Sequence, residues 1–291
     1  MRVGTIIRTI SNQYQVLGEN EEVYNCLAMG KVRNGISPVV GDKVNYEKLE
    51  DKYCIQKVLP RINSLIRPSI ANVDQAIIVM STLDPDFSSV LIDRLIFLIS
   101  YANIKPVLCI TKMDLIKDEI AYKVIIDKLD SYKDMGYEVY ITGKDYDVEI
   151  IKKLLSNKIS VLTGQSGAGK SSLLNRIDPS FELKTQEISK ALGRGKHTTR
   201  HCELHKVGDG WVADTPGFSS LDFYHMSNPK FKESLLPFAK LQDECKFQDC
   251  NHIHEPGCAI KKAVEDKVID AEYYQHYIEI VNIIQNKRVK Y

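Results

Sequence analysis

Two short runs in this chain carry the residue types that bind a nucleotide. The first is Gly164-Gln165-Ser166-Gly167-Ala168-Gly169-Lys170-Ser171, in which a glycine and four variable residues precede Gly-Lys-Ser. In such a loop, backbone N–H groups point at phosphate, the lysine reaches the β and γ phosphates, and the serine hydroxyl binds Mg²⁺. An apolar run at 159–162 and a helical run from Ser172 to 176 supply the strand-to-helix context that the motif requires. We therefore expect residues 164–172 to hold phosphate; the alternative is a glycine-rich turn with a surface lysine.

The second run is Thr111-Lys112-Met113-Asp114, directly after a buried strand predicted at 106–110. An aspartate there can accept hydrogen bonds from N1–H and the exocyclic amine of guanine, whereas adenine offers no such pair of donors. The consensus of this motif begins with asparagine, so Thr111 keeps a hydroxyl and loses the amide. Thr142-Gly143-Lys144, after the strand predicted at 137–141, lies where a second loop would contact the base. An exposed turn at a strand end is the alternative for Thr111 to Asp114.

A third candidate is Asp214-Thr215-Pro216-Gly217, which follows a short strand predicted at 210–213. It would place the Asp214 carboxylate near the magnesium ion and the Gly217 amide toward the γ phosphate. A strand that ends in an Asp-Pro-Gly turn is common, so this motif alone is weak. Its position after the phosphate loop strengthens it.

The guanine-type motif, Thr111 to Asp114, precedes the phosphate-type loop, residues 164–171. In an ordinary GTPase the phosphate loop comes first. Either the guanine-type run is a chance match, or the strands of a GTPase domain are circularly permuted. Permutation is physically allowed, since such a site is made from loops at one edge of a parallel sheet and spatial neighbours need not be sequence neighbours. The permuted reading predicts GTP and GDP as ligands, with Mg²⁺ at the nucleotide.

The elements that would position these loops divide the chain into three parts. Residues 1–67 show about five short alternating strands with glycine and proline between them, which predicts a small antiparallel barrel of the oligonucleotide/oligosaccharide-binding (OB) type. Residues 68–223 alternate buried strands with helices at 88–102, 118–135 and 147–156, which indicates a parallel sheet covered by helices on both faces. Residues 224–291 are polar and helical, and the last helix is predicted at 270–285.

The third part contains a cluster of metal-binding residue types, Cys245-x₄-Cys250-x-His252-x₅-Cys258. Three thiolates and one imidazole are enough for a closed tetrahedral zinc site, and a site with four protein ligands is structural. His254 is close enough in sequence to compete with His252. Free surface thiols are the alternative reading of the cluster.

Composition limits the remaining possibilities. The chain has 291 residues, 26% of them charged and 44% hydrophobic, with a formal net charge of +1, which is typical of globular proteins. No apolar run reaches the ~20 residues of a membrane span. The N-terminus lacks the long apolar run of a secretory signal, and four of the seven cysteines are scattered, so we expect a cytoplasmic protein without membrane contact, by default a monomer.

Taken together, these stretches resemble the RsgA (YjeQ/YloQ) family of circularly permuted GTPases in small ribosomal subunit biogenesis. The resemblance covers the whole length and implies an OB-fold RNA-binding domain at 1–67, a permuted GTPase domain at 68–223 and a zinc-binding helical domain at 224–291. Gly193-Arg194-Gly195-Lys196-His197-Thr198-Thr199-Arg200 is similar to the family's switch I segment. By that likeness Thr198 or Thr199 contacts Mg²⁺ and the γ phosphate, and His252 rather than His254 is the zinc ligand.

The resemblance also implies a small (30S) ribosomal subunit and its 16S rRNA as partners, with late assembly as the process and subunit-stimulated hydrolysis as the trigger of release. Phe218 stands where many GTPases carry a water-orienting glutamine, and we hypothesise that His197 acts instead once a ribosome orders the segment. A solvated loop histidine is the alternative. Two other protein classes stay open: a phosphate-loop ATPase or kinase, and a non-catalytic RNA-binding module that uses GTP only for stability.

Overall fold

The computed structural model describes residues 1–10, 13–33, 36–65, 69–143, 147–179, 202–213 and 222–286. The chain divides into two compact units. The first comprises Met1–Ala76, Val148–Thr163 and Lys170–Gly217, and the second comprises Ile77–Asp147, Gly164–Gly169 and Phe218–Tyr291. Each unit is therefore assembled from segments that are far apart in the sequence.

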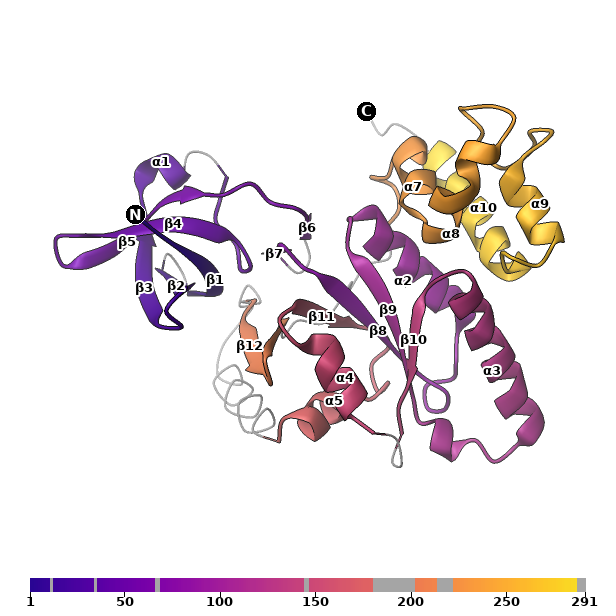
Figure 1. The fold of residues 1–291 in the computed structure, drawn as a ribbon, viewed down its shortest axis with the longest axis horizontal. Coiled ribbons are helices and arrows are strands. Elements are labelled where there is room, and N and C mark those ends of the chain that lie inside the picture. The colour runs from indigo at the N-terminus through magenta and orange to yellow at the C-terminus, as the bar shows by residue number, and fades with distance from the viewer. Residues whose placement is uncertain are drawn as a thin grey trace. The chain divides into compact units, whose positions relative to one another are not determined.

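The N-terminal part of the first unit is a closed five-stranded barrel (Figure 1), as the sequence predicts. It departs from the predicted antiparallel arrangement in one place, because its third and fifth strands pair in parallel. Its strands are β1 (Arg2–Ile10), β2 (Gln13–Gly18), β3 (Val23–Ala28), β4 (Lys43–Leu49) and β5 (Lys52–Val58), with the short helix α1 (Gly30–Arg33) between β3 and β4. They are hydrogen-bonded in the order β1-β2-β3-β5-β4. Alternate residues point inward, and Ile6, Val16, Val44 and Ile55 are fully buried in the barrel core.

Six further strands form one sheet with the hydrogen-bonded order β10-β9-β8-β11-β13-β12. They are β8 (Gln75–Ser81), β9 (Lys105–Thr111), β10 (Glu138–Ile141), β11 (Ile159–Thr163), β12 (Leu204–Val207) and β13 (Gly210–Ala213), and a separate short pair joins β6 (Ser64–Leu65) to β7 (Ile70–Ala71). Every residue of β8 is buried, as expected for a central strand covered on both faces.

The sheet departs from the predicted parallel arrangement at one edge. The strand pairs β9/β10 and β11/β13 are parallel, but β12 runs antiparallel to β13. Only Gly208 and Asp209 separate these two strands. A two-residue connection can join only antiparallel neighbours, because a parallel crossover needs about a dozen residues or more.

The helices that accompany the sheet begin close to their predicted positions, and polar side chains cap two of them. They are α2 (Ser89–Tyr101), α3 (Glu119–Asp134), α4 (Glu149–Leu155) and α5 (Lys170–Ile177). The Ser88 hydroxyl accepts a hydrogen bond from the backbone N–H of Leu91, and the Asp118 carboxylate accepts one from Ile120. In the part of the chain that the structure describes, no helix has the length and apolar character needed to cross a bilayer.

The C-terminal helices share a core with α2. They are α7 (Asn228–Ser234), α8 (Leu236–Leu241), the 3₁₀ turn η2 (Gln242–Glu244), α9 (Ala259–Glu265) and α10 (Ala271–Gln285) (Figure 1). The ring of Phe97 on α2 packs edge-on against Phe231 and Tyr273, with centroids 5.4 and 5.1 Å apart, and all three side chains are fully buried. This aromatic contact accounts for the grouping of α2 and the C-terminal helices in one unit. The division of the chain into three domains, at residues 67 and 223, stays a prediction.

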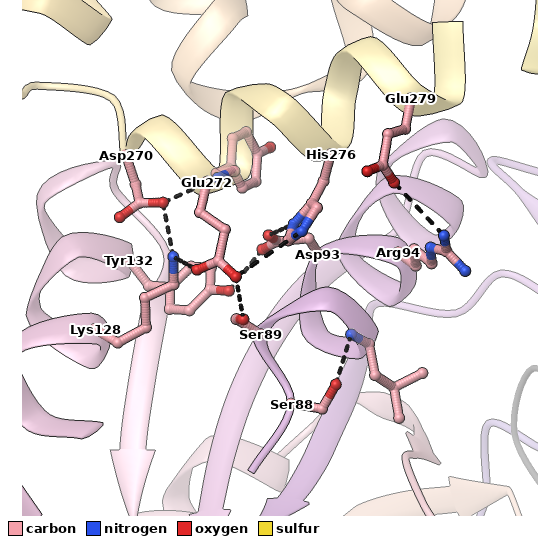
Figure 2. A network of polar contacts seen from close by, with 12 residues as sticks. Ser88, Ser89, Asp93, Arg94, Lys128, Tyr132, Asp270, Glu272, His276 and Glu279 are labelled. Atoms are coloured by element: carbon pink, nitrogen blue, oxygen red, sulfur yellow. Dashed lines mark hydrogen bonds and ion pairs between the residues drawn. The ribbon is translucent and has the colours of Figure 1, made fainter. Parts of the chain in front are cut away.

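A buried carboxylate joins α2, α3 and α10 (Figure 2). Asp93 on α2 is fully buried, and its Oδ1 accepts a hydrogen bond from the Tyr132 hydroxyl at 2.6 Å. Its Oδ2 lies 2.6 Å from Nδ1 of His276 on α10. This contact raises the pKa of His276, because the protonated imidazole faces a carboxylate. Burial raises the pKa of Asp93, and the two partners offset that penalty only in part.

A second layer of charge surrounds this contact. Lys128 on α3 bridges Asp270 and Glu272 at the start of α10, with Nζ–O distances of 2.7 Å to each. Glu272 also accepts a hydrogen bond from the Ser89 hydroxyl at 2.8 Å. Glu272 Oε1 lies 3.9 Å from Nε2 of His276, so the imidazole faces carboxylates from both α2 and its own helix. These contacts align the start of α10 with α2 and α3.

Replacing His276 with glutamine tests whether the buried pair stabilises the fold. Because the pKa of His276 is raised in the folded protein, its contribution is complete below the unfolded value of about 6.5 and is lost as pH rises through the folded value. We expect the variant to lose about 3 kcal/mol of unfolding free energy at pH 6. The loss should shrink at pH 9, as measured by urea denaturation followed by circular dichroism.

Glu279→Gln is the matched control. Glu279 pairs with Arg94 between the same two helices at 3.6 Å, but this pair is exposed to solvent, so its loss should cost less than about 1 kcal/mol. A His276→Gln effect that is equally large at both pH values would contradict the protonated pair.

Candidate functional site

The phosphate-type loop lies against the end of β8. Gly164 directly follows β11 and has a φ of +125°, and a Cβ atom built there would lie 2.0 Å from the carbonyl oxygen of Val79 on β8. Only glycine permits this approach, because any side chain would overlap the backbone. The loop continues to Gly169, and α5 begins at Lys170. The strand, loop and helix that the motif requires are therefore present.

Thr111 connects this loop to the guanine-type motif. It is the last residue of β9, and its hydroxyl donates a hydrogen bond of 2.7 Å to the carbonyl oxygen of Ala168. Both residues are buried. Thr111 stands where the motif's consensus has asparagine, and its hydroxyl makes a hydrogen bond between the two runs. The structure thus brings together two segments that are more than fifty residues apart in the sequence.

The rest of the guanine-type motif forms a tight turn after β9. Lys112 has a φ of +62°, and Met113–Leu115 form the 3₁₀ turn η1. The Lys112 ammonium donates hydrogen bonds to the carbonyl oxygens of Leu83 and Asp84, and its own carbonyl accepts one from Thr82 at 2.8 Å. Asp114 is exposed. Among the described residues no hydrogen bond or ion pair involves its carboxylate, which leaves both oxygens available to a ligand.

The predicted second base loop is described only in part. Thr142 follows β10 and is buried, and its hydroxyl donates to the carbonyl oxygen of Ile110 at 3.3 Å. Its backbone N–H donates to the same oxygen at 2.7 Å. The Thr142 side chain therefore fixes this loop to β9, while Gly143 continues toward Lys144, which lies outside the described residues.

Several other predicted residues also fall outside the described ranges. They are the switch residues and the aspartate-led turn, namely His197, Thr198, Thr199, Asp214 and Gly217. At the start of α5, Lys170 is half-buried, and burial lowers the pKa of its ammonium. Ser171 and Ser172 are exposed on the first turn of the same helix.

The four predicted metal ligands converge in the C-terminal part. One ligand atom from each of Cys245, Cys250, His252 and Cys258 lies within 4.8 Å of every other. Nδ1 of His252 is 3.6 Å from Sγ of Cys245 and 3.5 Å from Sγ of Cys258. A tetrahedral zinc ion with usual Zn–S and Zn–N bond lengths requires an N···S separation of about 3.6 Å, so the residues fit the metal. His254 is exposed and lies outside the cluster.

The loop that carries His252 is held by residues that the sequence analysis missed. Glu255 accepts hydrogen bonds from the backbone N–H groups of Asn251, Ile253 and His254 at 2.7 to 3.0 Å. Burial alone would raise the pKa of Glu255, but these donors outweigh it and lower the pKa to about 2.

Two tyrosines on α10 complete this support. The hydroxyl of Tyr274 donates to the carbonyl oxygen of His252 at 2.7 Å, and that of Tyr277 donates to Asn251 at 2.8 Å. No local motif signals these contacts, because α10 follows the loop by about twenty residues.

Thr111→Val tests the link between the two candidate nucleotide-binding runs. Valine keeps the volume but removes the hydroxyl, which leaves the buried Ala168 carbonyl without this donor. We expect a loss of about 1–3 kcal/mol in unfolding free energy and faster hydrogen exchange across residues 164–169. Thr111→Ser keeps the hydroxyl and is the control. Equal exchange in the two variants would show that the bond does not hold the loop.

Comparison with known proteins gives the same picture over the full length. The profile of the RsgA GTPase family matches residues 58–224, and that of the RsgA N-terminal domain matches residues 3–55. Small ribosomal subunit biogenesis GTPase RsgA 1 of Listeria monocytogenes is 45% identical over 294 residues, and RsgA of Bacillus subtilis is 44% identical over 299 residues. Each match covers 100% of both chains.

Two solved structures share the fold. One, described as YloQ, a circularly permuted GTPase, has a TM-score of 0.85 and 37% sequence identity and covers 100% of this chain and 97% of its own. YjeQ from Thermotoga maritima has a TM-score of 0.84 and 33% identity, with 99% of each chain covered. The family profile spans more than half of the chain, the relatives span all of it, and the motifs occur in the permuted order. This chain therefore belongs to the RsgA family of circularly permuted GTPases.

Proposed function

We propose that this GTP hydrolase binds the small (30S) ribosomal subunit late in its assembly and leaves after hydrolysis. The proposed binding of GTP is supported by the 2.7 Å hydrogen bond from the Thr111 hydroxyl to the Ala168 carbonyl, which holds the guanine-type motif against the phosphate-type loop. The ribosomal part rests on the relatives from Listeria monocytogenes and Bacillus subtilis, which are named for small ribosomal subunit biogenesis.

The nucleotide site is proposed from the residues around this bond. The Asp114 carboxylate selects guanine by accepting two hydrogen bonds, and Lys112, Met113, Thr142, Gly143 and Lys144 shape the base pocket. Residues 164–172 cradle the phosphates, and Lys170 neutralises them. Ser171 would hold Mg²⁺, which supplies positive charge to the β and γ oxygens when bound.

The hydrolytic step is assigned to residues outside the described ranges. Thr198 or Thr199 completes the magnesium and γ-phosphate contacts, and Asp214 and Gly217 contribute from the aspartate-led turn. His197 orients the attacking water, because Phe218 cannot hydrogen-bond to it. Stimulation by the subunit follows if binding orders the segment that carries His197.

Contact with 16S rRNA is proposed from the barrel and from basic segments of the sequence. Residues 1–67 carry ten Lys and Arg against seven Asp and Glu, and a second basic run is Lys287-Arg288-Val289-Lys290. Such charges bind the phosphate backbone. A monomer in the cytoplasm, with an OB-fold domain at 1–67, a GTPase domain at 68–223 and a zinc-binding domain at 224–291, fits this role.

GTP turnover with and without purified small subunits tests the proposal. We expect turnover to rise when subunits are added, and His197→Ala to lose about 100-fold of the stimulated rate while still binding GTP. Asp114→Asn should bind GTP about 100-fold more weakly, since the uncharged amide oxygen can accept from only one of the two guanine donors while the amide N–H group faces the other. The same variant should regain turnover with xanthosine triphosphate, because the asparagine amide can donate to the extra carbonyl of xanthine.

Three outcomes would contradict separate parts of this proposal. Turnover that is unchanged by subunits would remove the ribosomal role. Equal binding of ATP and GTP would indicate a phosphate-loop ATPase or kinase. Unchanged stimulation in His197→Ala would remove the proposed role of that histidine alone.

The Cys₃His cluster is proposed to hold one structural Zn²⁺ through Cys245, Cys250, His252 and Cys258. The support is the convergence of the four ligand atoms within 4.8 Å and the agreement of the N···S separations with tetrahedral geometry. When bound, the ion cross-links the loop at 245–258. The residues themselves fix η2, the loop and the start of α9 to each other.

Cys250→Ser tests this structural role. We expect one zinc per chain in the wild-type protein, and loss of zinc together with a lower melting temperature in the variant, because the cross-link is broken. Zinc is measured by elemental analysis and melting by calorimetry. Cys54→Ser is the control, since Cys54 is also a buried thiol but lies in the barrel. Nucleotide affinity should change little in either variant. Unchanged melting in Cys250→Ser would sink the structural metal.

A further inference from the structure

A buried lysine lies beside the proposed metal cluster. Lys232 on α7 is only 7% exposed, and its ammonium donates a hydrogen bond of 2.7 Å to the carbonyl oxygen of Cys250. Within the described ranges no carboxylate lies within 4.0 Å of this ammonium. A carbonyl oxygen is a neutral acceptor, so this hydrogen bond does not cancel the buried charge. An unpaired buried ammonium is costly, which requires that something nearby be negative.

The carboxylate of Glu255, in the same loop as the cluster, does not fill this role. Both oxygens of Glu255 are occupied by three backbone N–H donors, and its side chain is only half-buried. The Lys261 ammonium, the other cation at this loop, is partly exposed and lies on the Glu255 carbonyl. Lys232 is therefore the deeply buried cation of this region, and its ammonium contacts the backbone carbonyl of Cys250, a predicted ligand of the cluster. Burial lowers the pKa of the His252 imidazole and the positive charge of Lys232 lowers it further, so the ammonium lies close enough to act on the cluster.

The charge of the cluster depends on the metal. Three thiolates and a neutral imidazole around a divalent ion leave one net negative charge, whereas the metal-free cluster with protonated thiols is neutral. Backbone N–H groups already point at two of the sulfurs: Ala259 donates to Cys245 at 3.4 Å and Lys261 donates to Cys258 at 3.5 Å. The site is thus built to favour thiolates, and one negative charge is left over for a cation.

We propose that Lys232 is the counter-ion of the metal-bound Cys₃His cluster and thereby raises its affinity for a divalent metal. The inference rests on the zinc site proposed above. In the loaded protein, the ammonium and the thiolate-rich cluster compensate each other in a region of low dielectric. In the metal-free protein, the same ammonium is buried without compensation. Lys232 therefore widens the stability difference between the two forms, although it ligates no metal.

Two substitutions separate the charge from the hydrogen bond. Lys232→Met removes both, and Lys232→Gln removes the charge but keeps an N–H donor for the Cys250 carbonyl. We expect both variants of the full-length protein to lose zinc to a competing chelator with at least about tenfold lower affinity than wild type, the range reported for residues that support metal ligands. We also expect chelation to lower their melting temperatures by less than it lowers that of wild type.

The controls make each failure distinguishable. Lys262→Gln removes the same charge from an exposed position on α9 and should leave zinc affinity unchanged. Wild-type protein that binds no zinc would overturn the metal site itself. Wild-type zinc affinity in Lys232→Gln would overturn the counter-ion proposal. If Lys232→Met destabilises the loaded and metal-free forms equally, the lysine only fills space and donates a hydrogen bond, and the proposal fails.

Discussion

The close approach of the phosphate-type loop to strands β8 and β9 is the contact on which the proposed nucleotide site depends. Gly164 passes so near the Val79 carbonyl that no side chain fits, and Thr111 donates a hydrogen bond to Ala168. Both contacts join the loop to strands that are its neighbours in space but not in the sequence. They are therefore insensitive to the order in which the chain supplies the strands, which is why a permuted sequence can retain the site of an ordinary GTPase.

The second unit extends this arrangement to the metal cluster. The guanine-type motif, residues 164–169 and the cysteine cluster all belong to it. Lys112 binds carbonyls in the segment that leads into α2, and α2 carries Asp93 and Phe97, which contact α10. The tyrosines of α10 hold the loop of His252 in turn. Contacts and chain connections thus link the proposed nucleotide-binding loops to the proposed zinc site within one compact unit, and the contacts of α2 with α10 are buried.

Buried polar groups set the specificity of this packing. Asp93 is paired with a histidine and a tyrosine from two other helices, and Lys232 on α7 donates to the backbone carbonyl of Cys250. Each group would be costly to bury alone, so the helices can pack well only in the arrangement that supplies its partner. Aromatic residues such as Phe97 and Tyr273 fill the remaining volume. They stabilise the packing by burying apolar surface, and they select the packing partner less strictly than the buried polar groups do.

The sequence by itself determined the elements and the chemistry that depends on neighbours in the chain. A continuous apolar run at 106–110 indicated β9, helical runs indicated α2 and α3, and fixed spacings indicated the candidate phosphate loop and the candidate metal ligands. It did not reveal β12, Glu255, Lys232 or the Asp93–His276 pair. These depend on where separate segments meet. A local pattern records backbone preference and burial, whereas the partner of a buried charge is decided only when the tertiary fold places two distant side chains within hydrogen-bond distance.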